Sequence, residues 1–183
     1  MTSPLTRLRV LDMSRILAGP WAAQTLADLG AEVIKIERPG IGDDTRSWGP
    51  PFLTDSDGNE TTEAAYFHSA NRGKKSITVD ITTPEGQDIV RALARKCDIL
   101  LENYKVGGLA RYGLGYKDLK AHNPGLVYCS ITGFGQTGPY AERAGYGAIG
   151  EAMGGLRYVV GDPSVPPSRV GISIGDTLAA TFG

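Results

Sequence analysis

The stretch LRVLDMSRILAGPWAAQTLADLGAEVIKIE, residues 8–37, decides the expected fold. An apolar extended segment at 8–13 is followed by a turn at 14–20, and residues 21–29 then repeat apolar positions at helical spacing as far as a glycine. Residues 31–37 alternate as a short strand until Arg-Pro-Gly stops it. This order predicts a βαβ unit, which is the building block of parallel sheets.

The same alternation of strand and helix continues along the chain. Thr83-Pro-Glu-Gly opens an amphipathic helix that ends at Lys96. The other expected elements, in chain order, are a long loop at 40–59, a helix at 64–69, strands at 76–81, 98–103 and 126–132, short helices at 116–122 and 146–155, and a final helix after a turn at Gly175-Asp176. The pattern predicts an α/β fold with a Rossmann-like, open, mainly parallel sheet and helices on both faces.

Composition excludes several classes of protein. The chain has 183 residues, of which 41% are hydrophobic, which is enough for a core and unlike a disordered segment. It has 19 Lys and Arg against 20 Asp and Glu, so it lacks the clustered basic excess that nucleic-acid binding needs. Its 25 glycines are about twice the usual share and predict many tight turns and close backbone approaches.

Cysteine usage and hydropathy point to the cytoplasm. Cys97 and Cys129 each sit in an apolar run and are expected to be buried, reduced thiols. The N-terminus has no signal-peptide pattern, and no apolar run reaches the ~18 residues of a membrane span. We therefore expect a soluble, cytoplasmic protein with no membrane partner.

Common cofactor and metal motifs are missing from the sequence. The first turn has one glycine followed by Pro20, so Glu37 at the end of the second strand does not complete a G-x-G-x-x-G fingerprint. No P-loop is present. His68 and His122 are isolated, and Asp43-Asp44 is more typical of a turn than of a cation site. We expect no metal site and no tightly bound cofactor.

Basic residues lie near the expected loop tips. Each one alone is typical of a solvated surface charge, but their placement after successive strands makes an anionic ligand worth considering. They are Arg38, Arg72, Lys74, Lys75, Arg111 and Arg143.

Asp176 has two interpretations from its context. Between Gly175 and an apolar helix, it is typical of a helix N-cap whose carboxylate accepts bonds from free amides. The same geometry can present a carboxylate to an electrophile, with a backbone N–H nearby to hold an oxyanion.

Several stretches, taken together, resemble the class III CoA-transferases, the formyl-CoA transferase and L-carnitine CoA-transferase group, whose relatives include α-methylacyl-CoA racemases. The match runs in order over nearly the whole chain and is specific as a set. The stretches are LDMSRILAGP at 11–20, DLGAEVIKIERPG at 28–40, GDDTR at 42–46, NRGKKS at 71–76, DILLENY at 98–104 and SITGFGQTGP at 130–139.

The resemblance implies transfer of CoA from an acyl-CoA to a free carboxylate, with CoA as a substrate. The family's aspartate nucleophile falls on Asp176, which would pass through an aspartyl anhydride and an aspartyl-CoA thioester. The family's CoA-contacting segments fall on Leu17, Ala18, Arg38, Val79, Asp80, Ile81, Thr82, Asn103, Tyr104, Lys105, Arg111, Arg143, Ala144, Gly145 and Tyr146.

The racemase branch is disfavoured at one position. Those relatives use a His after Ala-Gly as acid and base, whereas this chain has Tyr146 after Ala144-Gly145. The stretches at 42–52 and 128–139 look most like the branch that handles dicarboxylates such as succinate and hydroxymethylglutarate. A small dicarboxylate is therefore the expected acceptor.

Two departures from the family pattern matter. An Asp often follows Gly-Tyr in the family, but Gly147 stands here and removes a helix cap or an active-site hydrogen bond. Family members are roughly twice as long and form interlocked homodimers. We therefore expect 1–183 to be an incomplete large domain that exposes Leu178, Ala179 and Phe182, binds CoA weakly and turns over little. The alternative is an inactive fragment that binds CoA or pairs with another subunit.

Overall fold

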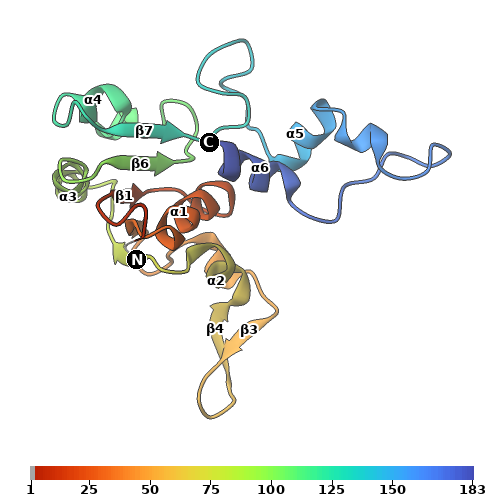
Figure 1. Cartoon of the computed structure of the whole chain (residues 1–183), viewed down its shortest axis with the longest axis horizontal. Helices are drawn as coiled ribbons and strands as arrows, with labels where there is room; N and C mark the ends of the chain where they lie inside the picture. The colour runs from red at the N-terminus through yellow and green to blue at the C-terminus, as the bar shows by residue number, and fades with distance from the viewer. Residues whose placement is uncertain (1–2) are drawn as a thin grey trace.

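Five parallel strands form the central sheet of the computed structural model, which describes residues 3–183 (Figure 1). Their spatial order is β5-β2-β1-β6-β7, and every neighbouring pair is parallel. This is the Rossmann-like order, with the switch point between β1 and β6. The strands are β1 (Arg9–Asp12), β2 (Glu32–Glu37), β5 (Lys75–Thr78), β6 (Ile99–Glu102) and β7 (Val127–Ser130). The predicted parallel α/β fold is confirmed.

Helices cover both faces of this sheet because adjacent residues of each buried strand point to opposite sides. On one face, Leu11 and Leu100 pack with side chains of α3 (Pro84–Ala94) and α4 (Tyr116–Lys120). On the other face, Val10 and Leu101 pack with α1 (Ala18–Asp28) and with Ala180 of α6 (Ile174–Phe182). The predicted coverage of both faces is confirmed.

The first turn is shorter than predicted. Helix α1 begins at Ala18 and includes Pro20, which a first helical turn tolerates because its missing N–H has no partner there. Gly19 is required by close packing, since a Cβ at that position would lie 2.2 Å from the Ser14 side chain.

The prediction that residues 40–59 form a loop is wrong. This segment contains the 3₁₀ turn η1 (Asp44–Ser47) and part of a hairpin. The hairpin is made by β3 (Phe52–Thr54) and β4 (Glu60–Ala64), and it projects from the sheet in Figure 1. The hairpin turn is held by Asp55, whose carboxylate accepts bonds from the Asp57 and Asn59 amides at 2.9 Å. These strands are short and polar, so they lack the apolar alternation that identifies strands in a sequence.

The remaining segments lie around the sheet. They are α2 (Ala65–Asn71), η2 (Ala110–Tyr112), α5 (Gly147–Met153) and η3 (Leu156–Val159). Helix α6 packs against α1 and α5, and the expected exposure of Leu178, Ala179 and Phe182 is confirmed, with Phe182 83% exposed.

Both cysteines are free thiols. Cys97 is buried as predicted, and this burial raises its pKa to about 11, so it is a poor nucleophile. Cys129 is only half-buried, which differs from the prediction, because it lies in the edge strand β7, which has a single neighbouring strand.

Candidate functional site

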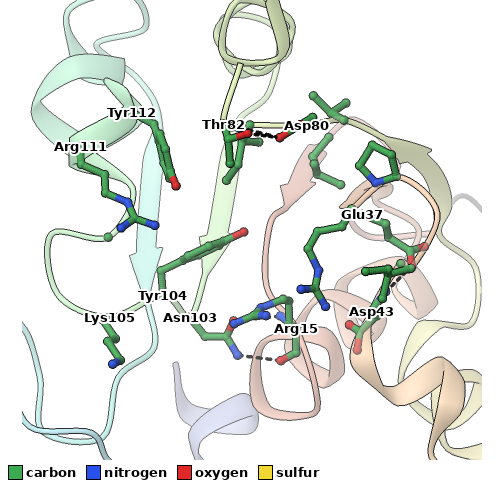
Figure 2. A pocket seen from close by; sticks show the side chains of 18 residues that line it. Arg15, Glu37, Asp43, Asp80, Thr82, Asn103, Tyr104, Lys105, Arg111 and Tyr112 are labelled. Atoms are coloured by element: carbon green, nitrogen blue, oxygen red, sulfur yellow. Dashed lines mark hydrogen bonds between the residues drawn. The ribbon is translucent and has the colours of Figure 1, made fainter. Parts of the chain in front are cut away.

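A cavity of about 770 Å³ opens at the carboxyl ends of the strands, where open α/β sheets bind ligands (Figure 2). Arg111 and Tyr112 lie on one side of it, and Glu37 and Asp43 lie on the other, with Tyr104 between them. The full lining is Arg15, Ile36, Glu37, Arg38, Pro39, Ile41, Gly42, Asp43, Val79, Asp80, Ile81, Thr82, Asn103, Tyr104, Lys105, Gly108, Arg111 and Tyr112.

The cavity combines an apolar wall with cations at its rim. Val79 and Ile81 follow β5 and supply apolar surface suited to a planar ring. The Arg38 guanidinium lies 2.5 Å from the Asp44 carboxylate, so this cation is already paired. The Arg111 guanidinium lies 4.5 Å from the centre of the Tyr112 ring, and within residues 3–183 it has no carboxylate partner.

A smaller cavity of about 160 Å³ adjoins the first and shares Asn103, Tyr104 and Lys105 with it. Its other wall includes the segment from Ala141 to Tyr146, and the Arg143 guanidinium rests 4.3 Å from the Tyr140 ring centre. This segment can approach β7 because Gly133 and Gly145 touch through their backbones. A Cβ on Gly133 would lie 2.2 Å from the Gly145 Cα.

Asp176 lies in the first turn of α6 and lines neither cavity. The N-cap interpretation is wrong, and so is the turn expected at Gly175-Asp176, because the helix begins at Ile174 and Ser173 is its N-cap. The Asp176 carboxylate is half-buried, and this burial raises its pKa.

Gly147 connects Asp176 to the smaller cavity. A Cβ on Gly147 would lie 2.7 Å from the Asp176 Oδ2, so the glycine leaves room for this carboxylate. Gly147 directly follows Tyr146, which lines the smaller cavity. Tyr66 of α2 also lies near, since burial and then the Asp176 charge raise the pKa of its hydroxyl. Asp176 thus lies outside both cavities, against the residue that directly follows the lining of the smaller one.

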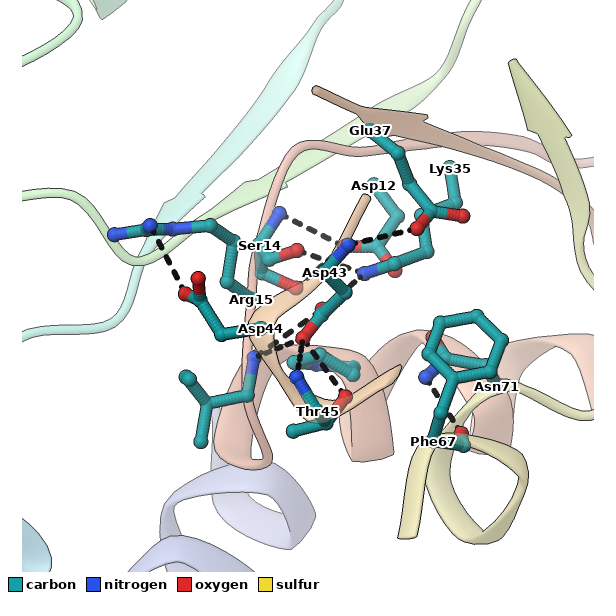
Figure 3. A network of polar contacts seen from close by, with 12 residues as sticks. Asp12, Ser14, Arg15, Lys35, Glu37, Asp43, Asp44, Thr45, Phe67 and Asn71 are labelled. Carbon is teal, nitrogen blue, oxygen red and sulfur yellow. Dashed lines mark hydrogen bonds and ion pairs between the residues drawn. The ribbon is translucent and has the colours of Figure 1, made fainter. Parts of the chain in front are cut away.

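A buried network of charges lies behind the larger cavity (Figure 3). The Lys35 ammonium contacts the Asp43 carboxylate at 3.0 Å and donates to the Ser14 carbonyl at 2.9 Å. The Lys74 ammonium contacts the Asp12 carboxylate at 2.8 Å. Burial alone raises the pKa of Asp12, but Lys74 and Lys35 outweigh it, so the pKa lies below its ordinary value. These are structural ion pairs.

This network and Asn103 fix the first turn from two sides. The Asp43 carboxylate accepts from the Ile16 amide at 3.3 Å, which holds Ile16 at φ 71°, a region that side-chain-bearing residues rarely adopt. The Asn103 side chain accepts from the Arg15 N–H at 2.9 Å and donates to the Arg15 carbonyl at 2.7 Å. The turn that carries Arg15 into the cavity is therefore held in one conformation.

Glu37 is not available to a ligand. Its carboxylate accepts two bonds from the Arg46 guanidinium, each 2.8 Å, and one from the Ser76 hydroxyl at 2.5 Å. Burial alone would raise the pKa of Glu37. The hydrogen bonds from these donors and from the Asp43 amide have a larger and opposite effect, so the pKa is lowered to about 2. The acid at the end of β2 thus stabilises the fold instead of binding a ribose.

The sequence matches the model of "CoA-transferase family III" over residues 5–183. The chain belongs to CoA-transferase family III. It is 52% identical over 179 residues to a succinate–glutarate CoA-transferase of Agrobacterium fabrum and 52% identical over 179 residues to a succinyl-CoA:glutarate CoA-transferase of Mus musculus. These alignments cover 98% of this chain but 44% and 39% of the two relatives.

A solved structure of a CAIB/BAIF family protein from Brucella suis has the same fold, with a TM-score of 0.92 and 52% identity. It matches 100% of this chain and 48% of that chain. The family III chain described here therefore spans about half the length, or less, of the relatives that it matches.

The geometry brings most of the expected site residues of this family III chain together. Nine line the larger cavity and four more the smaller one, whereas Leu17 and Ala18 are buried at the start of α1 and line neither. The lining residues are Arg38, Val79, Asp80, Ile81, Thr82, Asn103, Tyr104, Lys105 and Arg111, with Arg143, Ala144, Gly145 and Tyr146 in the smaller cavity.

Other expected or overlooked residues have different places. Lys74 was expected at a loop tip, but its side chain is 2% exposed because it neutralises Asp12. Arg72 and Lys75 pair with Asp28 and Glu32 at the surface. No sequence pattern selects Tyr66, and only the fold brings its hydroxyl near the Asp176 carboxylate.

Within residues 3–183, no three His, Cys, Asp or Glu side chains are grouped so as to hold a metal ion. In the same part of the chain, each helix is too short or too polar to cross a bilayer.

Proposed function

We propose that this chain supplies the CoA site and the nucleophile of a CoA-transferase that moves CoA from an acyl-CoA to a small dicarboxylate. Family membership and the succinate and glutarate in the names of the relatives support this substrate class. The observation that carries the proposal is the half-buried Asp176 carboxylate with a raised pKa, which lies against Gly147, the residue that follows Tyr146 of the smaller cavity.

In the proposed reaction, an Asp176 carboxylate oxygen attacks the thioester carbonyl and the C–S bond breaks, which gives a mixed anhydride and CoA thiolate. The thiolate then attacks the aspartyl carbonyl, releases the acyl group as a carboxylate and leaves an aspartyl-CoA thioester. The acceptor carboxylate attacks this thioester and displaces CoA thiolate, which gives a second mixed anhydride. The thiolate then attacks the acceptor carbonyl of this anhydride, which forms the new acyl-CoA and releases the Asp176 carboxylate. Each step exchanges one carbonyl substituent, so no redox partner or metal is required.

The two cavities suggest how CoA would lie. The larger cavity has the volume and the apolar wall for a nucleotide, with Arg111 placed for its phosphates. The smaller cavity continues past Lys105 to Tyr146, which is next to Gly147 and therefore to Asp176. The thioester, at the end of acyl-CoA opposite the nucleotide, would thus be directed toward the Asp176 carboxylate.

The test is a transfer assay with succinyl-CoA and glutarate, in which glutaryl-CoA is measured by chromatography. The proposal expects glutaryl-CoA that forms only when both substrates are present. A second candidate is CoA binding without transfer, because Asp176 lines neither cavity. Saturable CoA binding with no transfer between any acyl-CoA and dicarboxylate would favour it. The interlocked homodimer that the resemblance implies stays a prediction.

Replacing Arg111 or Arg143 by alanine should weaken CoA binding about tenfold, because within residues 3–183 neither guanidinium has a carboxylate partner that competes with a phosphate. Arg38→Ala should have a smaller effect, since Arg38 must first leave Asp44. Calorimetric titration with CoA at two salt concentrations measures both effects. If the Arg95→Ala control, on an exposed residue that lines neither cavity, weakens binding equally, the phosphate assignment is wrong.

Gly147→Ala should slow the reaction of Asp176 without unfolding the protein. The new methyl group would lie 2.7 Å from Oδ2, so the carboxylate must move, while alanine is a good residue for the first turn of α5. We expect about tenfold slower glutaryl-CoA formation at unchanged thermal stability. Gly150→Ala is the matched control, because a Cβ there meets open space. Equal rates in both variants would contradict the placement of Asp176.

A further inference from the structure

Glu151 is a buried acid that the proposed reaction does not use. It lies on α5, and its side chain is 1% exposed. Within residues 3–183, neither of its carboxylate oxygens has a hydrogen-bond partner. Its nearest cation is Arg169, whose Nε lies 3.5 Å from Oε2 and whose own side chain is 49% exposed. A buried carboxylate with so little compensation destabilises a fold.

Glu151 lies against the turn that carries Asp176. Helix α5 packs on α6, and a Cβ on Gly175 would lie 3.7 Å from the Glu151 Cγ. Gly147, one helical turn before Glu151, lies against the Asp176 carboxylate itself. Residues four apart lie on the same face of a helix. The face of α5 that carries Glu151 therefore also contacts the Asp176 carboxylate, through Gly147.

The groups that face Asp176 come from each element packed around it. Glu151 on α5 adds to the effect of burial in raising the pKa of Asp176, while Arg169, before α6, and the Asp176 amide work against them. Tyr66 of α2 supplies a hydroxyl that is neutral at physiological pH. Helix α1 presents alanines to α6, including Ala22 and Ala23 beside Ala180. Glu151 is thus the second carboxyl group identified next to Asp176.

We propose that Glu151 is a positioning residue that promotes acylation of Asp176 by electrostatic repulsion. The inference rests on the proposed function. In the free protein, two carboxylates share one partly exposed arginine. When an Asp176 oxygen bonds to the acyl carbon and the C–S bond breaks, the negative charge leaves with the CoA thiolate. The repulsion between Asp176 and Glu151 then disappears, so the free protein is destabilised relative to the acylated one.

The test uses Glu151→Gln, which keeps the size of the side chain and removes its charge. After mixing with succinyl-CoA, we measure the rate at which Asp176 is acylated as a function of pH. We expect acylation to slow about tenfold, because Asp176 becomes less basic and so less nucleophilic. The midpoint of the curve of acylation rate against pH should move to lower pH. Glu151→Asp should restore part of the rate. Glu60→Gln, on the exposed hairpin strand β4, is the matched control and should match the unmodified protein.

Two further readouts separate electrostatics from a structural role. Glu151→Gln should melt at the same or a higher temperature, because a buried charge is removed. Arg169→Gln should move the pH midpoint up, opposite to Glu151→Gln. Any of three results would overturn the inference. They are an unchanged acylation rate and pH midpoint in Glu151→Gln, a shift of the pH midpoint in the same direction in both variants, and unfolding of Glu151→Gln. Absence of acylation in the unmodified protein would instead reject the proposed function.

Discussion

Asp176→Asn is expected to abolish CoA transfer, with at least about a 10³-fold loss of rate. An amide cannot attack the thioester to form the anhydride, and Asp176 is the carboxylate that lies against Gly147, which follows Tyr146 of the smaller cavity. Glutaryl-CoA formation from succinyl-CoA and glutarate is the measurement. The control is Asp57→Asn, on an exposed residue of the distant hairpin turn, which should retain full activity.

The same substitution should not harm the fold. The pKa of Asp176 is higher in the folded protein than its ordinary value, so the folded state binds this proton more tightly. Its contribution to stability is therefore present at low pH and is lost as the pH rises through the folded-state pKa. At neutral pH the ionised carboxylate is unfavourable, and Asp176→Asn should melt at the same or a higher temperature. Unfolding together with inactivity would mean that Asp176 is a structural residue.

Lys35→Met is expected to lower the free energy of unfolding by about 3–5 kcal/mol. The substitution leaves the Asp43 carboxylate, which is fully buried, without its cation at 3.0 Å. The Asp43 carboxylate also accepts from the Ile16 amide, so the first turn should loosen at the same time. Urea denaturation of the purified protein measures the loss.

A double variant isolates the charge from the shape. Lys35→Met combined with Asp43→Asn removes both charges but keeps a side-chain acceptor for the Thr45 amide, and it should recover part of the lost stability. Lys117→Met, on the exposed face of α4, should change stability by less than about 0.5 kcal/mol. A double variant no more stable than Lys35→Met would show that the ion pair is not the cause.

Periodicity predicted the sheet because its strands are apolar and separated by amphipathic helices. Helix α3 was the clearest case, since Thr83 does cap it by accepting from the Gly86 amide at 3.1 Å. The β3–β4 hairpin could not be found in this way. Its strands bury little apolar surface, and their pairing depends on the turn that Asp55 organises.

The site was predictable where it follows strand ends and was not where it depends on long-range contacts. Asn103 could be placed in the site because it directly follows β6. Arg111 could be placed there because it lies in η2, the next element after β6. Lys74 was expected at a loop tip, because its partner Asp12 is 62 residues away in the sequence. The burial of Glu151 depends on how α5 meets α6, which no local pattern encodes.

The central claim is that the Asp176 carboxylate forms a covalent bond with the substrate. The most direct measurement is peptide mapping by mass spectrometry after the protein is treated with succinyl-CoA and hydroxylamine, which converts an activated carboxyl group to a hydroxamate. We predict a hydroxamate on Asp176 that requires succinyl-CoA and is missing in Asp176→Asn. Transfer of CoA to glutarate with no hydroxamate on Asp176, or with one on another acid, would contradict the account.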